Sequence, residues 1–392
     1  MDPVVGFLHD LTGNDSLRAE ISGKVSLIAE KLRSGWADSK AVQDIDLKME
    51  LKNLLLELAR GRISAGGRFS NSHALWLDRF SSMYSTPEIV ARNRSSRLKG
   101  SSIVDIGSGA GMQSIYFGLN SSVQGIEESE MRYLLSLLNL KEFGVLPVNF
   151  VNGKYPENAG YLKVDLDTTI YADPLRGSGR KSDPQTLEPD PRSIIQYYME
   201  RVKGFVFDIP LMMTPDKLQI RGETEYISVD GILSRATFYS SSLAEASSSA
   251  VLLPSGLRLK GEPRTVIFEE GIGPALVMPD PAIVKANILY LVTEGSQLYR
   301  VYSDSRRLVL ASRDHDWGIP GEHFDMISLC NEYSLRSEIA KLKPSKVIPR
   351  YSIPPETYYQ FVNSFRSDTN EPNPLYLIRY DGKIAICRKA TR

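Results

Sequence analysis

The stretch Val104-Asp105-Ile106-Gly107-Ser108-Gly109-Ala110-Gly111 decides the fold class of this 392-residue chain. A short apolar run over 102–106 predicts a β-strand that ends directly in three glycines at alternate positions. Glycine lets the backbone take positive φ and lets a ligand approach the main chain, and a helix expected over 112–119 offers unpaired N–H groups. The stretch therefore predicts a strand, a ligand-binding loop and a helix. The alternative is a glycine-rich turn that binds nothing.

The spacing of the glycines and an acidic residue further along the chain indicate which ligand the loop holds. Glu127 ends the next expected strand, over 122–126, where a carboxylate accepts hydrogen bonds from both hydroxyls of a ribose. Pyrophosphate-binding loops read Gly-x-Gly-x-x-Gly, whereas here Gly111 comes one residue early and Met112 takes the sixth position. The acidic Asp105 before the first glycine also suits a cationic ligand without phosphate. We therefore expect S-adenosylmethionine rather than a nicotinamide dinucleotide as the cofactor.

The rest of the central region alternates between strand and helix patterns. A helix is expected over 128–143, further strands over 148–151, 168–172 and 204–209, and a closing hairpin over 223–229 and 232–239 around Asp230-Gly231. Alternating strands and helices imply an α/β fold with a parallel, doubly wound, Rossmann-like sheet that binds ligands at the carboxyl ends of its strands.

Three parts of the chain are expected. Residues 1–83 form a helical region, since apolar residues recur at three- and four-residue spacing, and Ser85-Thr86-Pro87-Glu88 then resembles a capped helix start. Residues 84–245 form the Rossmann-like domain. The serine clusters at 240–242 and 247–249 are the best linker candidate, and 250–392 follows as an α+β domain.

A candidate for the substrate side of the site follows the expected strand over 168–172. In methyltransferases that act on exocyclic amines, an Asp or Asn at this place accepts a hydrogen bond from the target amine, and an aromatic side chain stacks on the base. This chain has Asp173-Pro174-Leu175-Arg176, without a second proline and without the aromatic. We expect Asp173 to orient or deprotonate the acceptor. The alternative is an Asp-Pro turn that only shapes the pocket.

Composition limits the remaining possibilities. The chain is 42% hydrophobic and 24% charged, has no run of 18 apolar residues and does not begin with a secretory signal pattern, so we expect a cytoplasmic protein without a membrane span. The 47 basic and 47 acidic side chains balance, which removes any global argument for a polyanionic partner. Neither the four histidines nor the two cysteines have metal-site spacing, and no cysteine lies between 84 and 250, which argues against carbon-5 pyrimidine methylation through a thiolate.

Two local basic clusters remain candidates for nucleic-acid contacts. The loop over 177–184 follows the Asp-Pro segment and could grip phosphates, or it could be a solvated loop. The other cluster, just before the first strand, is more typical of a solvated helix face than of a binding patch; it consists of Arg92, Arg94, Arg97 and Lys99.

Taken in order, these segments resemble the class I methyltransferases that carry a C-terminal THUMP-like domain, a family of bacteria and archaea. The resemblance covers roughly 84–392 and rests on the following stretches: Ser85-Thr86-Pro87-Glu88-Ile89-Val90-Ala91, Arg97-Leu98, the glycine loop, Asp173-Pro174-x-Arg176, Leu187-Glu188-Pro189-Asp190-Pro191, Leu253-Pro254-Ser255-Gly256 and Met278-Pro279-Asp280-Pro281-Ala282-Ile283.

The resemblance implies a seven-stranded methyltransferase domain and a small C-terminal domain suspected of RNA binding. The residues it places at the cofactor are Asp105, Gly107, Ser108, Gly109, Gly111 and Glu127, and those at the acceptor are Asp173, Pro174 and Arg176. Two departures stand out. Asn152 stands where relatives often have an acidic residue for the adenine amine, and we expect it to substitute for that residue at the cofactor. The usual paired arginines after Asp-Pro are reduced to Arg176.

The expected function is therefore methylation of RNA, tRNA or rRNA, on an amine, with no metal. The alternatives are methylation of a small molecule or a protein, or a non-catalytic RNA-binding scaffold with a vestigial cofactor fold. The oligomeric state is left open.

Overall fold

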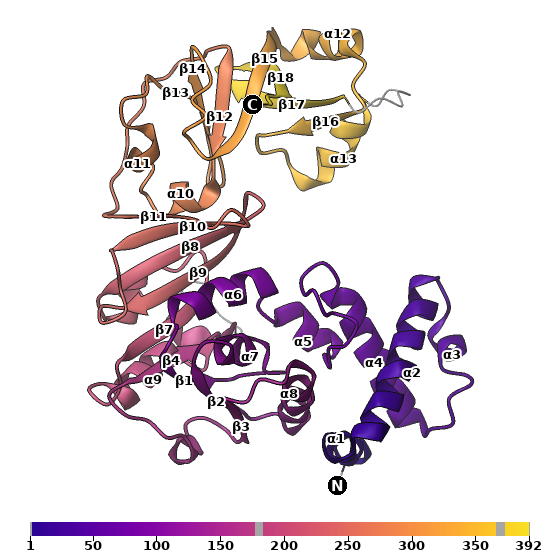
Figure 1. The fold of residues 1–392 in the computed structure, drawn as a ribbon. Helices are drawn as coiled ribbons and strands as arrows, with labels where there is room; N and C mark the ends of the chain where they lie inside the picture. The colour runs from indigo at the N-terminus through magenta and orange to yellow at the C-terminus, as the bar shows by residue number, and fades with distance from the viewer. Residues whose placement is uncertain (1, 177–182, 366–372, 392) are drawn as a thin grey trace. The chain divides into compact units, whose positions relative to one another are not determined.

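The computed structural model describes residues 2–176, 183–365 and 373–391. The chain divides into two compact units (Figure 1). The first consists of Met1–Glu223 and Ala236–Ala244, and the second of Thr224–Arg235 and Glu245–Arg392. The boundary between the units crosses the hairpin formed by Gly222–Val229 and Ile232–Ser240, and Thr224–Arg235 of this hairpin belongs to the second unit.

The first unit is built on a parallel sheet. Its strands are β1 (Ser102–Ile106), β2 (Ser122–Glu127), β3 (Val148–Asn152), β4 (Thr168–Ala172), β7 (Gly204–Ile209) and the antiparallel β9 (Ile232–Ser240). The full sheet has the order β11-β10-β8-β9-β7-β4-β1-β2-β3, in which β8 is Gly222–Val229. The predicted α/β, Rossmann-like fold class is confirmed, and β1, β4 and β7 have the limits that the sequence predicted.

The sheet is longer than predicted at its far edge. Nine strands join it within the described residues, where seven were expected, because β10 (Ser248–Leu253) and β11 (Leu257–Gly261) continue it. Ser248 and Ser249 are therefore buried in a strand rather than in a linker. The Ser248 hydroxyl donates to the carbonyl of Ala286 at 2.8 Å, which compensates its burial.

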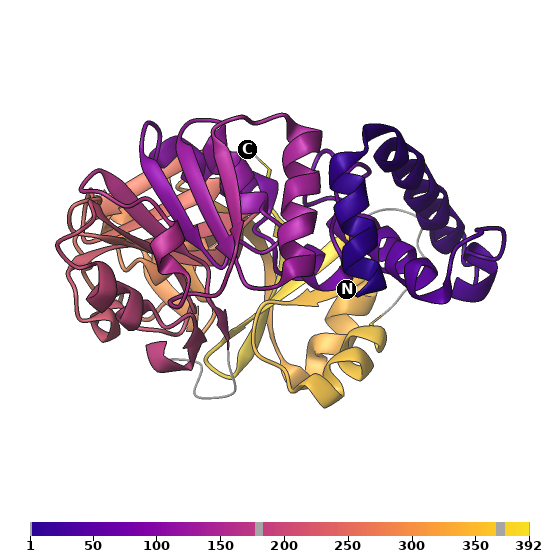
Figure 2. The ribbon, with the colours of Figure 1, turned by 90° about the horizontal axis from the view of Figure 1, so that it is seen from below.

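The N-terminal helices pack against the crossover helices of the sheet and share a hydrophobic core with them. They are α1 (Pro3–Gly13), α2 (Asp15–Arg33), α3 (Asp38–Ala41), α4 (Met49–Ala65), α5 (Arg79–Tyr84) and α6 (Glu88–Arg97); the crossover helices are α7 (Met112–Gly118) and α8 (Glu130–Phe143). One hydrophobic core joins Leu8 and Leu55 to Tyr116 and Leu135. In Figure 2, α8 lies between α1 and the strands.

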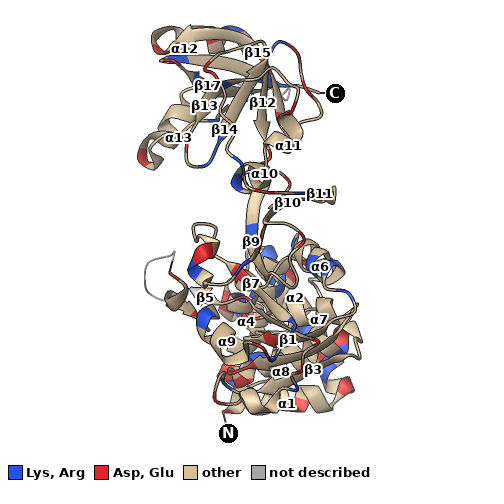
Figure 3. Cartoon of the chain, turned by 90° about the vertical axis from the view of Figure 1, so that its left-hand side faces the viewer, with Lys and Arg blue, Asp and Glu red and all other residues tan. Residues whose placement is uncertain are grey.

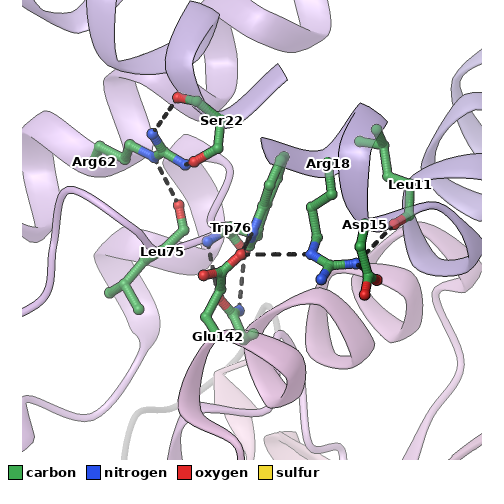
Figure 4. Close-up of polar contacts among 9 residues, drawn as sticks. Leu11, Asp15, Arg18, Ser22, Arg62, Leu75, Trp76 and Glu142 are labelled. Atoms are coloured by element: carbon green, nitrogen blue, oxygen red, sulfur yellow. Dashed lines mark hydrogen bonds and ion pairs between the residues drawn. The ribbon is translucent and has the colours of Figure 1, made fainter. Parts of the chain in front are cut away.

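Polar contacts fix the same interface, as Figure 4 shows. The Trp76 indole N–H donates to Glu142 of α8 at 3.1 Å. Within the helical region, the buried Arg62 guanidinium donates to the carbonyl oxygens of Leu75 and Ser22 at 3.0 and 2.9 Å and so holds the segment beside Trp76. The Asn139 amide binds both the N–H and the carbonyl of Trp76 and also donates to the Ala110 carbonyl at 2.9 Å. Because Ala110 belongs to the glycine loop, the helical region is tied to that loop through one side chain.

The sheet domain is completed by short elements. These are η1 (Ala159–Tyr161), β5 (Leu175–Arg176), η2 (Pro184–Thr186), β6 (Leu187–Glu188), α9 (Pro191–Tyr198) and η3 (Pro215–Leu218). Pro87 occupies the N-cap of α6 and its side chain makes no capping bond, so the predicted capped start there is wrong in detail.

The second unit carries a sheet of its own, ordered β13-β14-β12-β15-β18-β17-β16. Its elements are β12 (Ala275–Pro279), α10 (Pro281–Lys285), α11 (Tyr290–Thr293), β13 (Tyr299–Ser303), β14 (Leu308–Ser312), β15 (Gly321–Asn331), α12 (Glu332–Leu342), β16 (Lys346–Pro349), α13 (Pro355–Asn363), β17 (Pro374–Tyr380) and β18 (Lys383–Lys389). Asp381 and Gly382, both with positive φ, turn the predicted terminal hairpin. Free Cys330 and Cys387 are buried in this unit.

The prediction of a solvated face for the basic cluster before β1 is wrong for two of its four residues, Arg94 and Arg97. The side chains of Arg94 and Arg97 are 0% and 4% exposed and pair with Asp208 and Glu223. Arg92, which pairs with Glu88, and Lys99 are exposed. Sequence spacing could not show this, because the partners lie more than a hundred residues away. In Figure 3 basic and acidic positions are interspersed along the elements of the first unit.

Among the helices of the described residues, none is both long and apolar enough to cross a membrane.

Candidate functional site

The glycine loop runs from β1 into α7 with all three glycines in the left-handed region. Gly107, Gly109 and Gly111 have φ values of 78°, 58° and 81°. The N–H groups of Gly107 and Ser108 both donate to the Ile126 carbonyl, at 2.9 and 3.0 Å, which fastens the loop to the end of β2. L-residues with side chains adopt such φ values at a cost, so the alternating glycines are needed for this backbone path.

The three glycines differ in what surrounds them. A Cβ atom at Gly111 would lie 2.6 Å from Cζ of Phe150 and 2.8 Å from Cβ of Ser136, so this glycine is required by packing. A Cβ at Gly109 would meet no atom within 4 Å, and at Gly107 only Cδ of Pro189 at 3.9 Å. Gly107 and Gly109 thus present bare main chain to open space. Gly111 instead packs against Phe150 and Ser136 and anchors the loop to the domain.

Glu127 lies beside this open face. Its carboxylate accepts hydrogen bonds from the N–H of Gly109 at 2.9 Å and from the N–H of Ser129 at 3.0 Å. The residue is 5% exposed, and Arg132 comes within 4.0 Å of it. A carboxylate offers about four acceptor directions. Two main-chain donors therefore fix its orientation and leave further directions for ligand hydroxyls.

Asp105 lies beneath the loop rather than on its surface. It is 2% exposed, and its carboxylate accepts a hydrogen bond from the Ser114 hydroxyl at 2.5 Å. Burial raises the pKa of Asp105 to about 7, with the Ser114 bond acting against the rise and the charges of Asp173 and Glu127 adding to it. The structure therefore brings three predicted site carboxylates together at one edge of the sheet.

The predicted acceptor residues follow β4 at the same edge. Ala172 pairs with Ile106 of β1, so Asp173 comes directly alongside the start of the glycine loop. Asp173 is half-buried and Pro174 is buried. Arg176 pairs with Leu187 in the ribbon β5–β6, and Pro189, which follows β6, lies next to Gly107. The predicted basic loop falls on 177–182, outside the described residues, apart from Asp183 and Pro184.

Asn152 ends β3 opposite Glu127. Its amide nitrogen donates to the main-chain carbonyls of Glu127 at 3.0 Å and Glu128 at 3.5 Å, and the residue is exposed. The amide oxygen therefore faces away from those carbonyls and is presented beside the end of β2.

Sequence reasoning missed a buried network behind Asp173. Ala172 also pairs with Phe207 of β7, so Asp208 follows at the same level of the sheet. Arg94 donates to Asp208, to the Tyr171 hydroxyl at 2.9 Å and to the Thr237 hydroxyl at 3.0 Å. The second oxygen of Asp208 is buried and has no hydrogen-bond partner among the described residues. A charged residue in the apolar run over 205–209 was the signal available in the sequence.

Other parts of the surface fit a ligand less well. A hollow of about 870 Å³ lies at the amino ends of β1 and β2, lined by Ser102 and Ser122 among others, which is the edge opposite the glycine loop. Ligands of open α/β sheets bind at the carboxyl ends. No group of three or more His, Cys, Asp or Glu side chains suited to a metal ion occurs among the residues that the structure describes.

Comparisons with known proteins bear on the fold. A scan against models of protein families finds no match, and a search among curated proteins finds none either. Among solved structures, a protein described as a "putative methyltransferase" from Porphyromonas gingivalis W83 is similar over 95% of this chain and 99% of its own, with a TM-score of 0.74 at 18% identity.

Two further structures are similar over smaller regions. A precorrin-6y C5,15-methyltransferase from Geobacter metallireducens GS-15 covers 40% of this chain and 90% of its own, at 19% identity and a TM-score of 0.29. An RNA methyltransferase from Salinibacter ruber, in complex with S-adenosylhomocysteine, covers 41% and 94%, at 17% identity and the same TM-score of 0.29. At these TM-scores neither adds weight to the first. The strand order, the glycine loop and the first comparison together give one conclusion: this chain shares the fold of the Porphyromonas protein over nearly its whole length, and its first unit contains a Rossmann-like α/β sheet.

Proposed function

We propose that this protein is an S-adenosylmethionine-dependent methyltransferase that acts on RNA, with an exocyclic amine as the acceptor. The observation that carries the cofactor assignment is the pairing of an open glycine loop with Glu127, whose carboxylate is oriented by the N–H of Gly109. The RNA assignment rests on the resemblance to methyltransferases with a C-terminal THUMP-like domain, which we propose for 250–392.

The residues present suit S-adenosylmethionine. A side chain at Gly109 would fill the open space above the loop, which is the space a ligand on bare main chain requires. The charged side chains at the carboxyl edge are mainly acidic: Asp105, Glu127, Asp173 and Asp208 lie there with the buried guanidinium of Arg94. Such an edge favours a cation and disfavours a pyrophosphate.

Each site residue has a role that follows from its position. Glu127 would accept hydrogen bonds from the ribose hydroxyls, and the amide oxygen of Asn152 would accept one from the adenine amine. Gly107, Ser108 and Gly109 would face the amino-acid part of the cofactor, and Gly111 holds the loop in place. Asp105, buried behind the glycine loop, would add negative charge to the cofactor site.

Methyl transfer needs few further catalytic groups from the protein. The bound cofactor supplies an already activated methyl group, so that positioning and exclusion of water provide most of the rate. Asp173 would hold the acceptor amine and receive its proton, while Pro174 and the main chain of Arg176 keep the strand end in place.

The cofactor assignment is tested by calorimetry with S-adenosylmethionine on the wild-type protein and Glu127→Gln. The amide keeps an acceptor but loses the charge, so affinity should fall about 10- to 100-fold, the worth of a charge-assisted hydrogen bond. The adjacent, exposed Glu128→Gln is the matched control and should bind within about twofold of wild type. No binding to the wild-type protein would refute the assignment.

The RNA assignment is tested by transfer of labelled methyl groups to total RNA from a strain that lacks this protein. Wild-type protein should label a discrete RNA species, and Asp173→Ala should lower the rate about 100-fold or more, as expected for a lost acceptor-holding base. Binding of S-adenosylmethionine without labelling of any RNA would favour a small-molecule or protein acceptor.

A further inference from the structure

Helix α5 turns its apolar side chains outward and its two serines inward. Phe80, Met83 and Tyr84 are 38%, 54% and 50% exposed, whereas Ser81 and Ser82 are 5% and 0% exposed. Hydrophobic residues of a surface helix normally face the core. Positions i, i+3 and i+4 share one face of a helix, so the three side chains form a single exposed patch.

The patch is held in a fixed geometry. The Asp78 carboxylate accepts from the N–H of Ser81 at 2.8 Å and caps the start of α5. At the other end, the Arg68 guanidinium donates to the carbonyls of Ser82, Met83 and Ser85. With both ends secured, the orientation of the aromatic side chains does not depend on the intrinsic stability of a six-residue helix.

The patch is continuous with the proposed cofactor site. The Phe80 and Tyr84 ring centroids are 4.5 Å apart, and the Arg132 guanidinium carbon lies 4.3 Å from the centroid of Phe80. Arg132 is also within 4.0 Å of Glu127. Tyr84, Phe80, Arg132 and Glu127 thus form an unbroken row from the open surface to the carboxylate that we assign to the ribose.

The charges beside the rings indicate what covers them. Arg132 is 29% exposed in its side chain, and Arg79 is exposed and forms no ion pair with any described residue. Aromatic rings flanked by guanidinium groups are the chemistry that binds single-stranded nucleic acid, because bases stack on the rings and phosphates are attracted by the cations. The segment after β4 lacks the aromatic side chain that would otherwise stack on a target base.

We propose that Phe80 and Tyr84 form a stacking platform for an unpaired base of the RNA substrate, with Arg79 and Arg132 attracting its phosphates. This inference rests on the proposed function and assigns to the N-terminal helical region the recognition that the Asp173-Pro174 segment lacks. The specific occupant is a nucleobase in single-stranded RNA.

The test is fluorescence anisotropy with a labelled, single-stranded 12-nucleotide RNA of mixed sequence and saturating S-adenosylhomocysteine. The double variant Phe80→Ala/Tyr84→Ala should bind at least tenfold more weakly, since loss of one stack corresponds to about 5- to 150-fold. Phe80→Tyr keeps a ring and should bind within about twofold of wild type. Tyr161→Ala, which removes a 63% exposed tyrosine elsewhere in the first unit, should have no effect.

Calorimetry with S-adenosylmethionine on the same variants separates the two proposals. Unchanged cofactor binding together with weakened RNA binding supports the platform. RNA binding that is equal in the double variant and the wild type overturns the platform, as does an absence of binding to the wild-type protein, and neither result touches the cofactor assignment. Failure of the wild-type protein to bind S-adenosylmethionine overturns the proposed function. The anisotropy measurement with RNA still tests the platform in that case.

Discussion

Asp105 shows how a single buried side chain sets the electrostatics of this edge of the sheet. Its carboxylate has one hydroxyl donor, from Ser114, and lies near the carboxylates of Asp173 and Glu127. Burial without a cationic partner of its own disfavours the charged form. The residue is therefore costly to the folded state unless a cation occupies the site.

Replacement of Asp105 by Asn should stabilise the protein at high pH. Burial raises the pKa of this carboxyl from 3.8 to about 7, so between those values the folded state holds a proton that the unfolded state releases. The stability of the wild-type protein therefore falls as the pH rises from about 4 to about 7 on account of this group. Asp105→Asn keeps an acceptor for Ser114 and escapes this loss. Urea unfolding at pH 8 should show a gain on the order of 1 kcal/mol or more, which shrinks towards pH 4.5.

Asp165→Asn provides a control of opposite sign. The hydrogen bond from the Thr168 hydroxyl lowers the pKa of Asp165, so its charged form contributes stability above that pKa and loses it in acid. This variant should be less stable than wild type at pH 8. A gain in Asp165→Asn like that in Asp105→Asn would show that the effect is not specific to the buried site.

At the scale of elements, the loop between β1 and α7 combines two uses of glycine. Gly111 is buried against Phe150 and Ser136, whereas Gly109 faces open space. Both have positive φ, so the sequence pattern alone does not distinguish them. The difference lies in β3 and α8, which supply the atoms under Gly111.

Alanine substitutions should separate these two uses. Gly111→Ala adds strain at φ 81° and places a methyl group 2.6 Å from the Phe150 ring, so it should cost about 3 kcal/mol or more of unfolding free energy. Gly109→Ala meets only the backbone strain, about 1–2 kcal/mol. Its methyl group would nevertheless occupy the proposed cofactor space, so binding of S-adenosylmethionine should be lost while the fold persists. Urea unfolding and calorimetry on both variants check this; the reverse order of stabilities would contradict the assignment.

The elements themselves were largely predictable. Strands β1, β4 and β7 are short, mostly apolar runs, which is the pattern of buried parallel strands. Strand β10 was not recognised, because Ser248 and Ser249 look like linker residues and become strand residues only through the pairing with β8 and the bond to Ala286.

At the scale of the whole molecule, Arg94 joins parts of the first unit that are distant in sequence. From α6 it reaches Gln113 on α7, Tyr171 on β4, Asp208 on β7 and Thr237 on β9. These elements meet behind Asp173, so the network holds the buried side of the proposed acceptor site in place. Its charge also lies among carboxylates that would otherwise repel one another.

Arg94→Met should destabilise the first unit by roughly 3–5 kcal/mol, because removal of one partner leaves the buried carboxylate of Asp208 without its counter-charge. Chemical unfolding measures the loss. Arg94→Met combined with Asp208→Leu removes both charges and should recover a large part of it. Arg92→Met, at an exposed ion pair of the same helix, should change stability by less than about 1 kcal/mol. Equal losses in the double and single variants would show that the pair is not what holds these elements together.

The sequence by itself determined the glycine loop, the partner acid Glu127, the order of strands and helices around them and the position of Asp173 after β4. These features depend on spacing within about twenty residues and on periodicity, which are local properties of the chain. Tertiary structure decided which glycine bears packing, that Arg94 and Arg97 are buried counter-charges rather than surface cations, and that the aromatic side chains of α5 adjoin Glu127 through Arg132. Each of these depends on contacts between residues far apart in sequence, and the free energy of burying a charge or a ring is set by its neighbours in space.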